Sequence, residues 1–339
     1  MKKVGVVGFG FMGVTHALNI LKTGGLELRA IVERDPALIE KNLDGGLGNV
    51  ATGDAAAAAI REIPVFTSLD ECLEKADLDA LHLCVHTRLH YPLAKKALER
   101  GKHVLVEKPF TLDVGEGREL IGLAREKNLI LMVAHVVRFM PAYRLLKDWI
   151  DARAYGELEF LSLSRFSGVP AWGEWRSDQA VRAGSGGALF DLLIHDIDFL
   201  LSAMGEPRTI DPLVLPGRLS HHDYLSARWR FADPRRVAVI EGGDMFHSRL
   251  PFESRYIAKF ADASVSQSSH DPRGVQVADD ASVRRVEVGD PADGYLNEIR
   301  YFAGCLEDNR WPDECSPESS LRSVELAYRH IADKREDRT

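Results

Sequence analysis

The chain has 339 residues, of which 45% are hydrophobic and 28% charged, a composition that is ordinary for a soluble globular protein with two domains. The formal net charge is −8 and no block of lysine or arginine stands out, so nucleic acid is not an expected partner. No run reaches the roughly 18 apolar residues that a membrane helix needs, so no membrane partner is expected either.

Neither an export signal nor disulfide bonds are expected. The amino terminus runs from Met1 directly into a glycine-rich stretch, where a signal peptide would need its apolar segment. The four cysteines show no close metal-type pairing and are interpreted as reduced thiols: Cys72, Cys84, Cys305 and Cys315. These features indicate a cytoplasmic protein without a bound metal.

Strand-like and helix-like runs alternate over residues 1–135. Strands are expected at residues 3–8, 26–35, 63–68, 78–86, 101–109 and 129–135. Helices are expected after the first glycines, at 35–43, in an alanine-rich insertion before residue 60, and at 69–76, 90–101 and 114–128. This alternation predicts an α/β domain with a parallel, doubly wound sheet and right-handed crossovers.

The pattern changes after residue 135. One helix is expected at 138–156, a second at 188–204, and two more at 294–308 and 316–337. Strand-like runs lie between them, at 158–167, 210–219, 224–231, 235–246, 254–267 and 283–290. Residues 136–339 are therefore predicted to form an α+β domain with an open, mostly antiparallel sheet, which binds substrate and mediates oligomerisation. The last helices could pack back on the first domain.

A glycine fingerprint follows the first predicted strand. Gly8-Phe9-Gly10-Phe11-Met12-Gly13 fits G-x-G-x-x-G, opens a helix, and is followed about 20 residues later by Glu33 at the end of the second strand. Gly8 permits a tight turn, Gly10 lets the backbone approach a pyrophosphate, and Gly13 lets the helix pack on the sheet. The carboxylate of Glu33 can accept hydrogen bonds from ribose hydroxyls. The alternative is a structural turn with an incidental glutamate.

A charged pair ends the strand near residue 105. Glu107 and Lys108 precede Pro109 in the motif EKPF, at the carboxyl end of a strand, where such sheets bind their ligands. A lysine at a strand end is more often solvated, but this context directs Lys108 toward a bound cofactor.

The apolar helix predicted at 188–204 carries polar residues. Asp191 and His195 are four residues apart, which places them on one helix face, and Asp198 follows on the same side. Polar groups in an apolar helix are costly unless they are paired or used. We interpret Asp191 and His195 as candidate catalytic residues, against the alternative that each is satisfied locally.

These motifs resemble those of the glucose–fructose oxidoreductase/inositol dehydrogenase (Gfo/Idh/MocA) family. The resemblance rests on the fingerprint, Glu33, VLVEKPF at 104–110 and GSGGALFDLLIHDIDFL at 184–200, and it continues through the carboxyl-terminal helices. It implies a Rossmann domain followed by an open-sheet domain. It also implies NAD(P)-dependent oxidation of a sugar or cyclitol hydroxyl, or the reverse reduction.

The resemblance also implies individual roles. Lys108 matches the lysine of the EKP motif, and His195, with Asp191, matches the proton acceptor. The expected cofactor-binding residues are Gly8, Phe9, Gly10, Phe11, Met12, Gly13, Glu33, Arg34, Thr87, His90, Glu107 and Lys108. Two departures concern the stretch 85–90, which lacks the family's proline and asparagine, and Val136, where the family usually has asparagine. These two departures leave the identity of the substrate undetermined.

NAD is the expected cofactor, with NADP as the alternative, because Glu33 would repel a 2′-phosphate whereas Arg34 could tolerate one. A polyhydroxylated substrate, with or without a carboxylate, is expected from a set of arginines and tryptophans. The set comprises Arg138, Arg165, Trp172, Trp175, Arg176 and Arg182. Asp191 and His195 complete the expected substrate site.

Two other functions stay open. A cofactor-binding sensor would keep the fold without turnover, and a hydrolase or lyase would oxidise its substrate only transiently with bound NAD. A homodimer or homotetramer is expected, since the helices predicted after the second sheet are too few to cover both of its faces.

Overall fold

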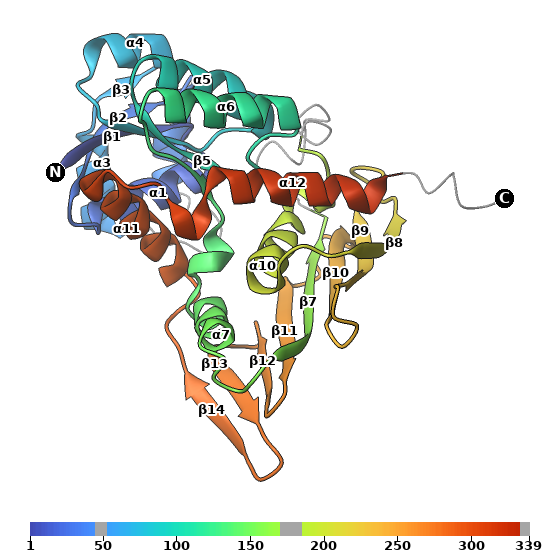
Figure 1. The fold of residues 1–339 in the computed structure, drawn as a ribbon. Coiled ribbons are helices and arrows are strands. Elements are labelled where there is room, and N and C mark those ends of the chain that lie inside the picture. The colour runs from blue at the N-terminus through green and yellow to red at the C-terminus, as the bar shows by residue number, and fades with distance from the viewer. Residues whose placement is uncertain (45–52, 170–184, 333–339) are drawn as a thin grey trace. The chain divides into compact units, whose positions relative to one another are not determined.

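The computed structural model describes residues 1–44, 53–169 and 185–332 (Figure 1). It contains two compact units. The first comprises Met1–Val136 with Tyr295–Leu321, and the second comprises Val137–Gly294 with the residues from Arg322 onward. Over the described parts of the chain, no helix is long and apolar enough to cross a membrane.

The first unit is built on a six-stranded sheet whose strands are all parallel, in the order β3-β2-β1-β4-β5-β6. Its strands are β1 (Lys2–Val7), β2 (Leu26–Val32), β3 (Val65–Phe66), β4 (Ala80–Leu83), β5 (His103–Glu107) and β6 (Leu131–Ala134). The expected doubly wound sheet is confirmed. Strand order reverses between β1 and β4, and ligands bind outside the carboxyl ends of the strands at such a point.

Helices cover both faces of this sheet (Figure 1). They are α1 (Phe11–Leu21), α2 (Ala37–Asp44), α3 (Asp54–Arg61), α4 (Leu69–Lys75), α5 (His90–Glu99), α6 (Val114–Glu126) and α11 (Asp293–Asp308). Another helix, α12 (Pro317–Ile331), begins in the first unit and continues into the second. Side chains alternate along each strand. Leu81 and Leu83 of β4 therefore join an apolar core with α4, α5 and α6. His82, between them, points to the opposite face and packs against Phe302 of α11.

All four cysteines are buried free thiols, and all lie in the first unit. Burial raises the pKa of Cys72 to about 11. Burial, with the charges of Glu107 and Glu298, raises the pKa of Cys84 well above its usual value. The raised pKa values favour the protonated thiol form of Cys72 and Cys84 at neutral pH.

The second unit is built on an eight-stranded sheet in the order β14-β13-β12-β11-β7-β10-β9-β8. Its strands are β7 (Leu158–Gly168), β8 (Thr209–Leu215), β9 (Tyr224–Arg230), β10 (Val237–Phe246), β11 (Glu253–Phe260), β12 (Ser264–Ser268), β13 (Asp271–Ala278) and β14 (Val283–Glu287). Neighbours are antiparallel except β7 and β10, which are parallel. The expected mostly antiparallel sheet is confirmed.

Three local expectations were wrong. The run 254–267 is two strands with a reversal at Ala261–Ala263, and β13 was not expected. The helix expected at 138–156 is a 3₁₀ turn, Val136–Phe139, followed by α7 (Pro141–Asp151). The helix expected at 188–204 is divided into α9 (Ala188–Asp191) and α10 (Ile194–Met204).

Candidate active site

The glycine fingerprint forms the turn between β1 and α1. Gly8 has φ of +82°, and a Cβ there would lie 2.5 Å from the carbonyl oxygen of Cys84, so only glycine fits. A Cβ on Gly13 would lie 2.0 Å from the carbonyl oxygen of Gly8. A Cβ on Gly10 would meet nothing within 4 Å. Because Gly10, the N-cap residue of α1, offers no side-chain hydrogen bond, the first-turn N–H groups of the helix can bind an anion, and this cradle fits a pyrophosphate.

Glu33 closes the same turn from the end of β2. The main-chain N–H of Phe9 donates to Oε2 of Glu33 (2.9 Å), and that of Asp35 donates to Oε1 (3.2 Å). The side chain of Asn42 in α2 donates to the carbonyl of Phe9 (2.7 Å), a contact that the sequence did not indicate. Both oxygens of Glu33 are thus fixed at the sheet edge where an adenosine ribose would bind, and Arg34 beside it is exposed.

The EKPF motif follows β5, with Glu107 buried and Lys108 half-buried. His90, the first residue of α5, lies behind this turn, with Nδ1 at 2.9 Å from the carbonyl of Pro109 and Nε2 at 3.0 Å from that of Val85. Burial lowers the pKa of His90, and its contacts with the two carbonyls oppose that shift. His90 therefore ties the EKPF turn to the end of β4, and the direct cofactor contacts of His90 and Thr87 stay predictions.

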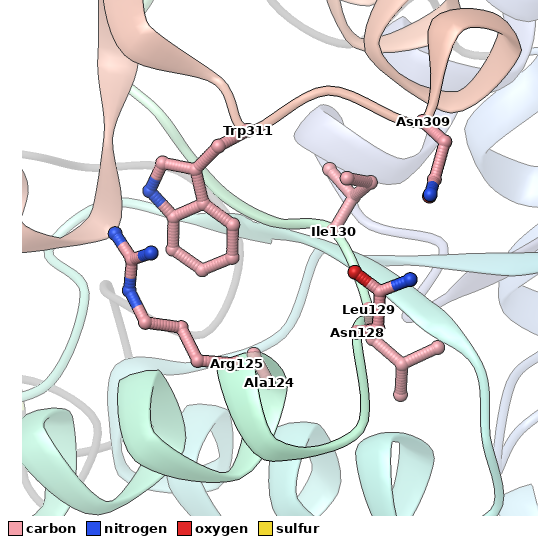
Figure 2. A pocket seen from close by; sticks show the side chains of 7 residues that line it. All are labelled: Ala124, Arg125, Asn128, Leu129, Ile130, Asn309 and Trp311. Atoms are coloured by element: carbon pink, nitrogen blue, oxygen red, sulfur yellow. The ribbon is translucent and has the colours of Figure 1, made fainter.

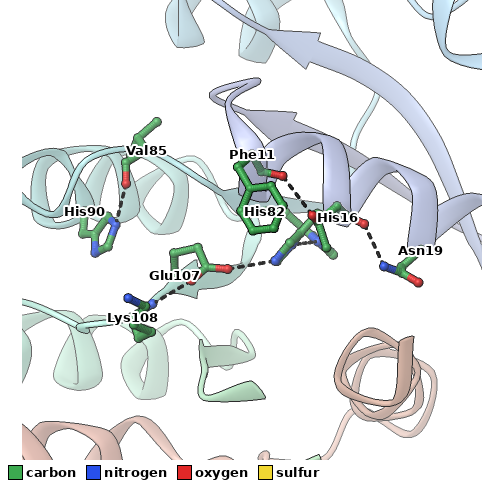
Figure 3. A network of polar contacts seen from close by, with 9 residues as sticks. Phe11, His16, Asn19, His82, Val85, His90, Glu107 and Lys108 are labelled. Atoms are coloured by element: carbon green, nitrogen blue, oxygen red, sulfur yellow. Dashed lines mark hydrogen bonds and ion pairs between the residues drawn. The ribbon is translucent and has the colours of Figure 1, made fainter. Parts of the chain in front are cut away.

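A buried polar network lies directly behind Lys108 (Figure 3). The main-chain N–H of Lys108 donates to Oε2 of Glu107 (3.2 Å), and Oε1 of Glu107 lies 3.0 Å from Nε2 of His16 in α1. Nδ1 of His16 lies 3.0 Å from Nδ1 of His82 in β4. The network joins the fingerprint helix to the EKPF motif, and neither histidine was identified from the sequence.

Asp191 and His195 lie on different helices, which corrects the expectation of one continuous helix. Asp191 ends α9, and His195 is in the first turn of α10. The N–H of Leu193 donates to the carbonyl of Ala188 (2.8 Å), a wider turn than an α-helix makes, so the four-residue spacing alone does not align the two side chains. Both side chains are half-buried.

The second unit also contains a buried carboxyl group that was not expected as a site residue. Asp244 in β10 is 3% exposed, and its N–H donates to the carbonyl of Asp223 (3.0 Å). Burial, followed by the charges of Asp223 and Asp191, raises the pKa of Asp244 to about 7. Asp244 therefore changes charge near neutral pH within electrostatic reach of Asp191.

Two of the arginines expected to bind substrate are paired with carboxylates of their own unit. Arg138 makes two hydrogen bonds of 2.6 Å to Asp198, and Arg165 makes bonds of 2.7 and 2.9 Å to Asp196. Both pairs are buried and fix α10 in place. These two arginines therefore give no support for a substrate carboxylate. Four further expected residues lie outside the described residues, namely Trp172, Trp175, Arg176 and Arg182.

A separate hollow of about 180 Å³ lies in the first unit at the end of α6 (Figure 2). The guanidinium of Arg125 lies 4.1 Å from the ring centroid of Trp311 and donates to Glu318 at 2.7 and 2.9 Å. Because Glu318 already balances its charge, the hollow is not suited to an anion. It also adjoins Asn128–Ile130, just before β6, whereas the fingerprint follows the carboxyl end of β1.

Two family models match this chain. One, described as an oxidoreductase family with an NAD-binding Rossmann fold, matches residues 2–135, and the GFO/IDH/MocA C-terminal domain matches residues 143–282. The chain belongs to the Gfo/Idh/MocA oxidoreductase family. The resemblance inferred from the motifs is thereby confirmed, and the first unit is an NAD-binding Rossmann domain. Within the described residues, no group of three histidine, cysteine or acidic side chains could hold a metal ion.

Relatives within the Gfo/Idh/MocA family include an uncharacterised oxidoreductase of Schizosaccharomyces pombe, 35% identical over 47% of this chain and 43% of the relative. UDP-N-acetylglucosamine 3-dehydrogenase of Acidithiobacillus ferrooxidans is 29% identical over 60% of this chain and 54% of the relative. The chain thus spans about half the length of these two relatives. Inositol 2-dehydrogenase of Rhizobium meliloti is 24% identical over 98% of both chains.

Solved structures share the fold over nearly the whole chain. Levoglucosan dehydrogenase, in complex with NADH and levoglucosan, has a TM-score of 0.81 at 20% identity and covers 97% of this chain and 96% of its own. A structure described as a myo-inositol dehydrogenase of Sinorhizobium meliloti has a TM-score of 0.76 at 24% identity and covers 99% and 98%.

Proposed function

We propose that the protein is an NAD-dependent dehydrogenase, or reductase in the reverse direction, that acts on a hydroxyl-bearing carbon of a sugar, sugar acid or cyclitol. The observation that carries this proposal is the placement of the fingerprint and the EKPF motif at the same edge of one parallel sheet, in a chain of this family. Relatives named as dehydrogenases of a nucleotide sugar and of inositol support the substrate class.

The residues of the first unit fit the cofactor. The turn 8–13 would bind the pyrophosphate with main-chain N–H groups, and Glu33 would accept hydrogen bonds from the adenosine ribose. NAD would supply the hydride acceptor. Glu33 also favours NAD over NADP, because its carboxylate would repel a 2′-phosphate.

We assign the proton chemistry to three side chains. His195 would take the hydroxyl proton during oxidation, since the ordinary pKa of an imidazole lies close to neutral pH. Lys108 would donate a hydrogen bond to the same oxygen and stabilise the negative charge that develops on it. Asp191 would orient the imidazole or a neighbouring substrate hydroxyl. Arg138, Trp172 and Arg176 stay proposed substrate contacts.

The test is steady-state kinetics with a panel of polyols, sugars and sugar acids, in which formation of the reduced cofactor is read by absorbance. Lys108→Ala should lower kcat about a hundredfold or more while NAD binding, measured by fluorescence, stays near normal. Lys75→Ala is the matched control, because that lysine is 64% exposed and pairs only with a surface carboxylate. His195→Ala should lower kcat similarly and flatten the acid limb of the pH profile.

Near-normal turnover by Lys108→Ala would contradict the catalytic assignment. The alternatives give different results. A sensor would bind NAD without turning over any compound of the panel, and an NAD-assisted hydrolase or lyase would form product without accumulating reduced cofactor.

A further inference from the structure

The network behind Lys108 continues beyond His82 into a second buried carboxyl group. Glu298, in α11, is fully buried, and neither of its oxygens has a hydrogen-bond partner among the described residues. Nε2 of His82, also fully buried, has no such partner either. An unpaired buried polar group costs about 1–3 kcal/mol, so two in one place call for an explanation.

The side chains of Glu298 and His82 face the same buried region of the first unit. Phe302, one helical turn after Glu298 on the same face of α11, packs edge-on against the ring of His82 at 5.4 Å between centroids. The pKa of Cys84, which directly follows β4, is raised by burial and by the charges of both Glu107 and Glu298. The titratable groups enclosed here come from α1, β4 and the residue after it, β5 and α11, and they are His16, His82, Cys84, Glu107 and Glu298.

Hydrogen-bond directions can be assigned along this network. The carboxylate of Glu107 only accepts, so His16 donates to it from Nε2–H. We assign His16 as neutral in this network, which leaves its Nδ1 as an acceptor and has His82 donate from its own Nδ1–H. Burial holds the pKa of His82 well below its usual value, so His82 is neutral and, in this assignment, its Nε2 is a bare acceptor.

Glu298 has the complementary form. Burial, reinforced by the charge of Glu107, raises the pKa of Glu298 well above its usual value, so its carboxyl group stays protonated and is a donor. A donor and an acceptor without partners thus lie in one enclosed region. One buried water, or direct contact, would satisfy both.

We infer that Glu298, His82, His16 and Glu107 form one buried hydrogen-bonded chain, which fixes the Glu107 carboxylate against the main-chain N–H of Lys108. The three residues behind Glu107 are positioning residues for Lys108. Their effect on turnover rests on the proposed function, whereas the existence of the chain does not.

The first test needs no substrate. The full-length protein is labelled with ¹⁵N-histidine, and the signals of His16 and His82 are assigned by their loss in His16→Gln and His82→Gln. At neutral pH, His82 should carry its proton on Nδ1 and His16 on Nε2. In Glu298→Leu the Nε2 signal of His82 should move toward the value of a nitrogen without a hydrogen bond, and in Glu298→Gln it should not. A proton on Nε2 of His82, or an unchanged signal in Glu298→Leu, would overturn the chain.

The second test compares an apolar and a polar replacement of Glu298. Glu298→Leu should lower kcat about tenfold with the KM for NAD little changed, while Glu298→Gln, which keeps a donor, should restore kcat to within about twofold. If Glu298 were an isolated buried acid, leucine would instead raise the melting temperature and leave kcat unchanged, because an uncompensated polar group is removed. That result would refute the positioning role.

The two tests separate this inference from the proposed function. Suppose the histidine signals behave as expected, but the wild-type protein binds NAD without oxidising any polyol. The proposed function then fails and the chain stands. If the protein instead oxidises a polyol while His82 carries its proton on Nε2, the proposed function stands and the chain fails.

Discussion

Gly10 and Gly13 are three residues apart in the fingerprint, yet they serve different purposes. The position of Gly13 leaves no room for a side chain, because the clash is with main-chain atoms of Gly8 that cannot move aside. Gly10 is exposed, with ordinary backbone angles and open space where a Cβ would be. Gly13 is therefore needed for the fold, whereas the open space at Gly10 supports the proposed approach of the cofactor.

We expect Gly13→Ala to destabilise the protein by about 3 kcal/mol and to abolish NAD binding. Gly10→Ala should leave the free energy of unfolding nearly unchanged and still weaken NAD binding at least about tenfold, because the added methyl group blocks the approach of the pyrophosphate. Urea denaturation and a fluorescence titration with NAD measure the two quantities separately. If Gly10→Ala bound NAD with normal affinity, the pyrophosphate would not approach the main chain at Gly10.

The position of residues was predicted well from the sequence where it depends on local chain geometry. The fingerprint and the EKPF motif are of this kind, because a turn and a strand end are set within a few residues. The pairing of Arg138 with Asp198 and of Arg165 with Asp196 was not predicted, because these partners lie 60 and 31 residues away. The contact between His16 and His82 joins residues 66 apart, and nothing in their immediate neighbours indicates it.

Helices and strands, too, were predicted well where the local sequence sets them and less well where it does not. Every strand of the parallel sheet was located correctly, because each is a short apolar run that alternates with a helical pattern. Strands β11 and β12 were joined because their reversal at Ala261–Ala263 contains neither glycine nor proline, and β13 was missed because only Gly274, Val275 and Val277 are buried in it. The break between α9 and α10 falls within an apolar run, where helical spacing continues across it.

The packing of α12 against β9 gives a pH-dependent contribution to stability. Trp229 of β9 donates from Nε1 to Nε2 of His330 (2.9 Å), and Nδ1–H of His330 donates to the carbonyl of Leu326 (2.7 Å). This arrangement needs a neutral imidazole, and burial lowers the pKa of His330 to about 4. The folded-state pKa lies below the unfolded value, so the contribution is complete above pH 6.5 and is lost as the pH falls toward 4.

We expect the free energy of unfolding to fall by about 3 kcal/mol between pH 6.5 and 4 on account of His330. His330→Gln cannot titrate but can still accept from Trp229, so it should lose less stability over this window. Urea denaturation at several pH values, followed by tryptophan fluorescence, provides the comparison. If the free energy of unfolding fell by the same amount in the wild type and in His330→Gln, the assignment of this pH dependence to His330 would be wrong.

For the molecule as a whole, the second sheet predicts self-association. One face is buried, with Gly242 of β10 close to Leu193, which lies between α9 and α10. The opposite face is only half-buried, and there Ser162 of β7 lies between Val239 of β10 and Ile257 of β11. A partly apolar sheet face that its own helices leave open is typical of an interface between identical subunits.

We therefore expect a dimer or tetramer at micromolar concentration, measured by light scattering. Ile257→Lys should shift the mass to that of the monomer because a charge is placed in the interface, whereas Ile257→Val should not. A monomeric mass for the wild-type protein would rule out this expectation.

All four cysteines lie in the Rossmann unit, so chemical modification of the thiols reports local unfolding of that unit. A maleimide reagent can react only when that unit unfolds at least in part, because all four thiols are buried. Local unfolding of the second unit alone would expose no cysteine and would not change the labelling rate. If NAD binds only the closed unit, labelling should slow about a hundredfold at a cofactor concentration of about 100 times the Kd, with no substrate needed. The rate of thiol modification thus measures cofactor affinity independently of turnover.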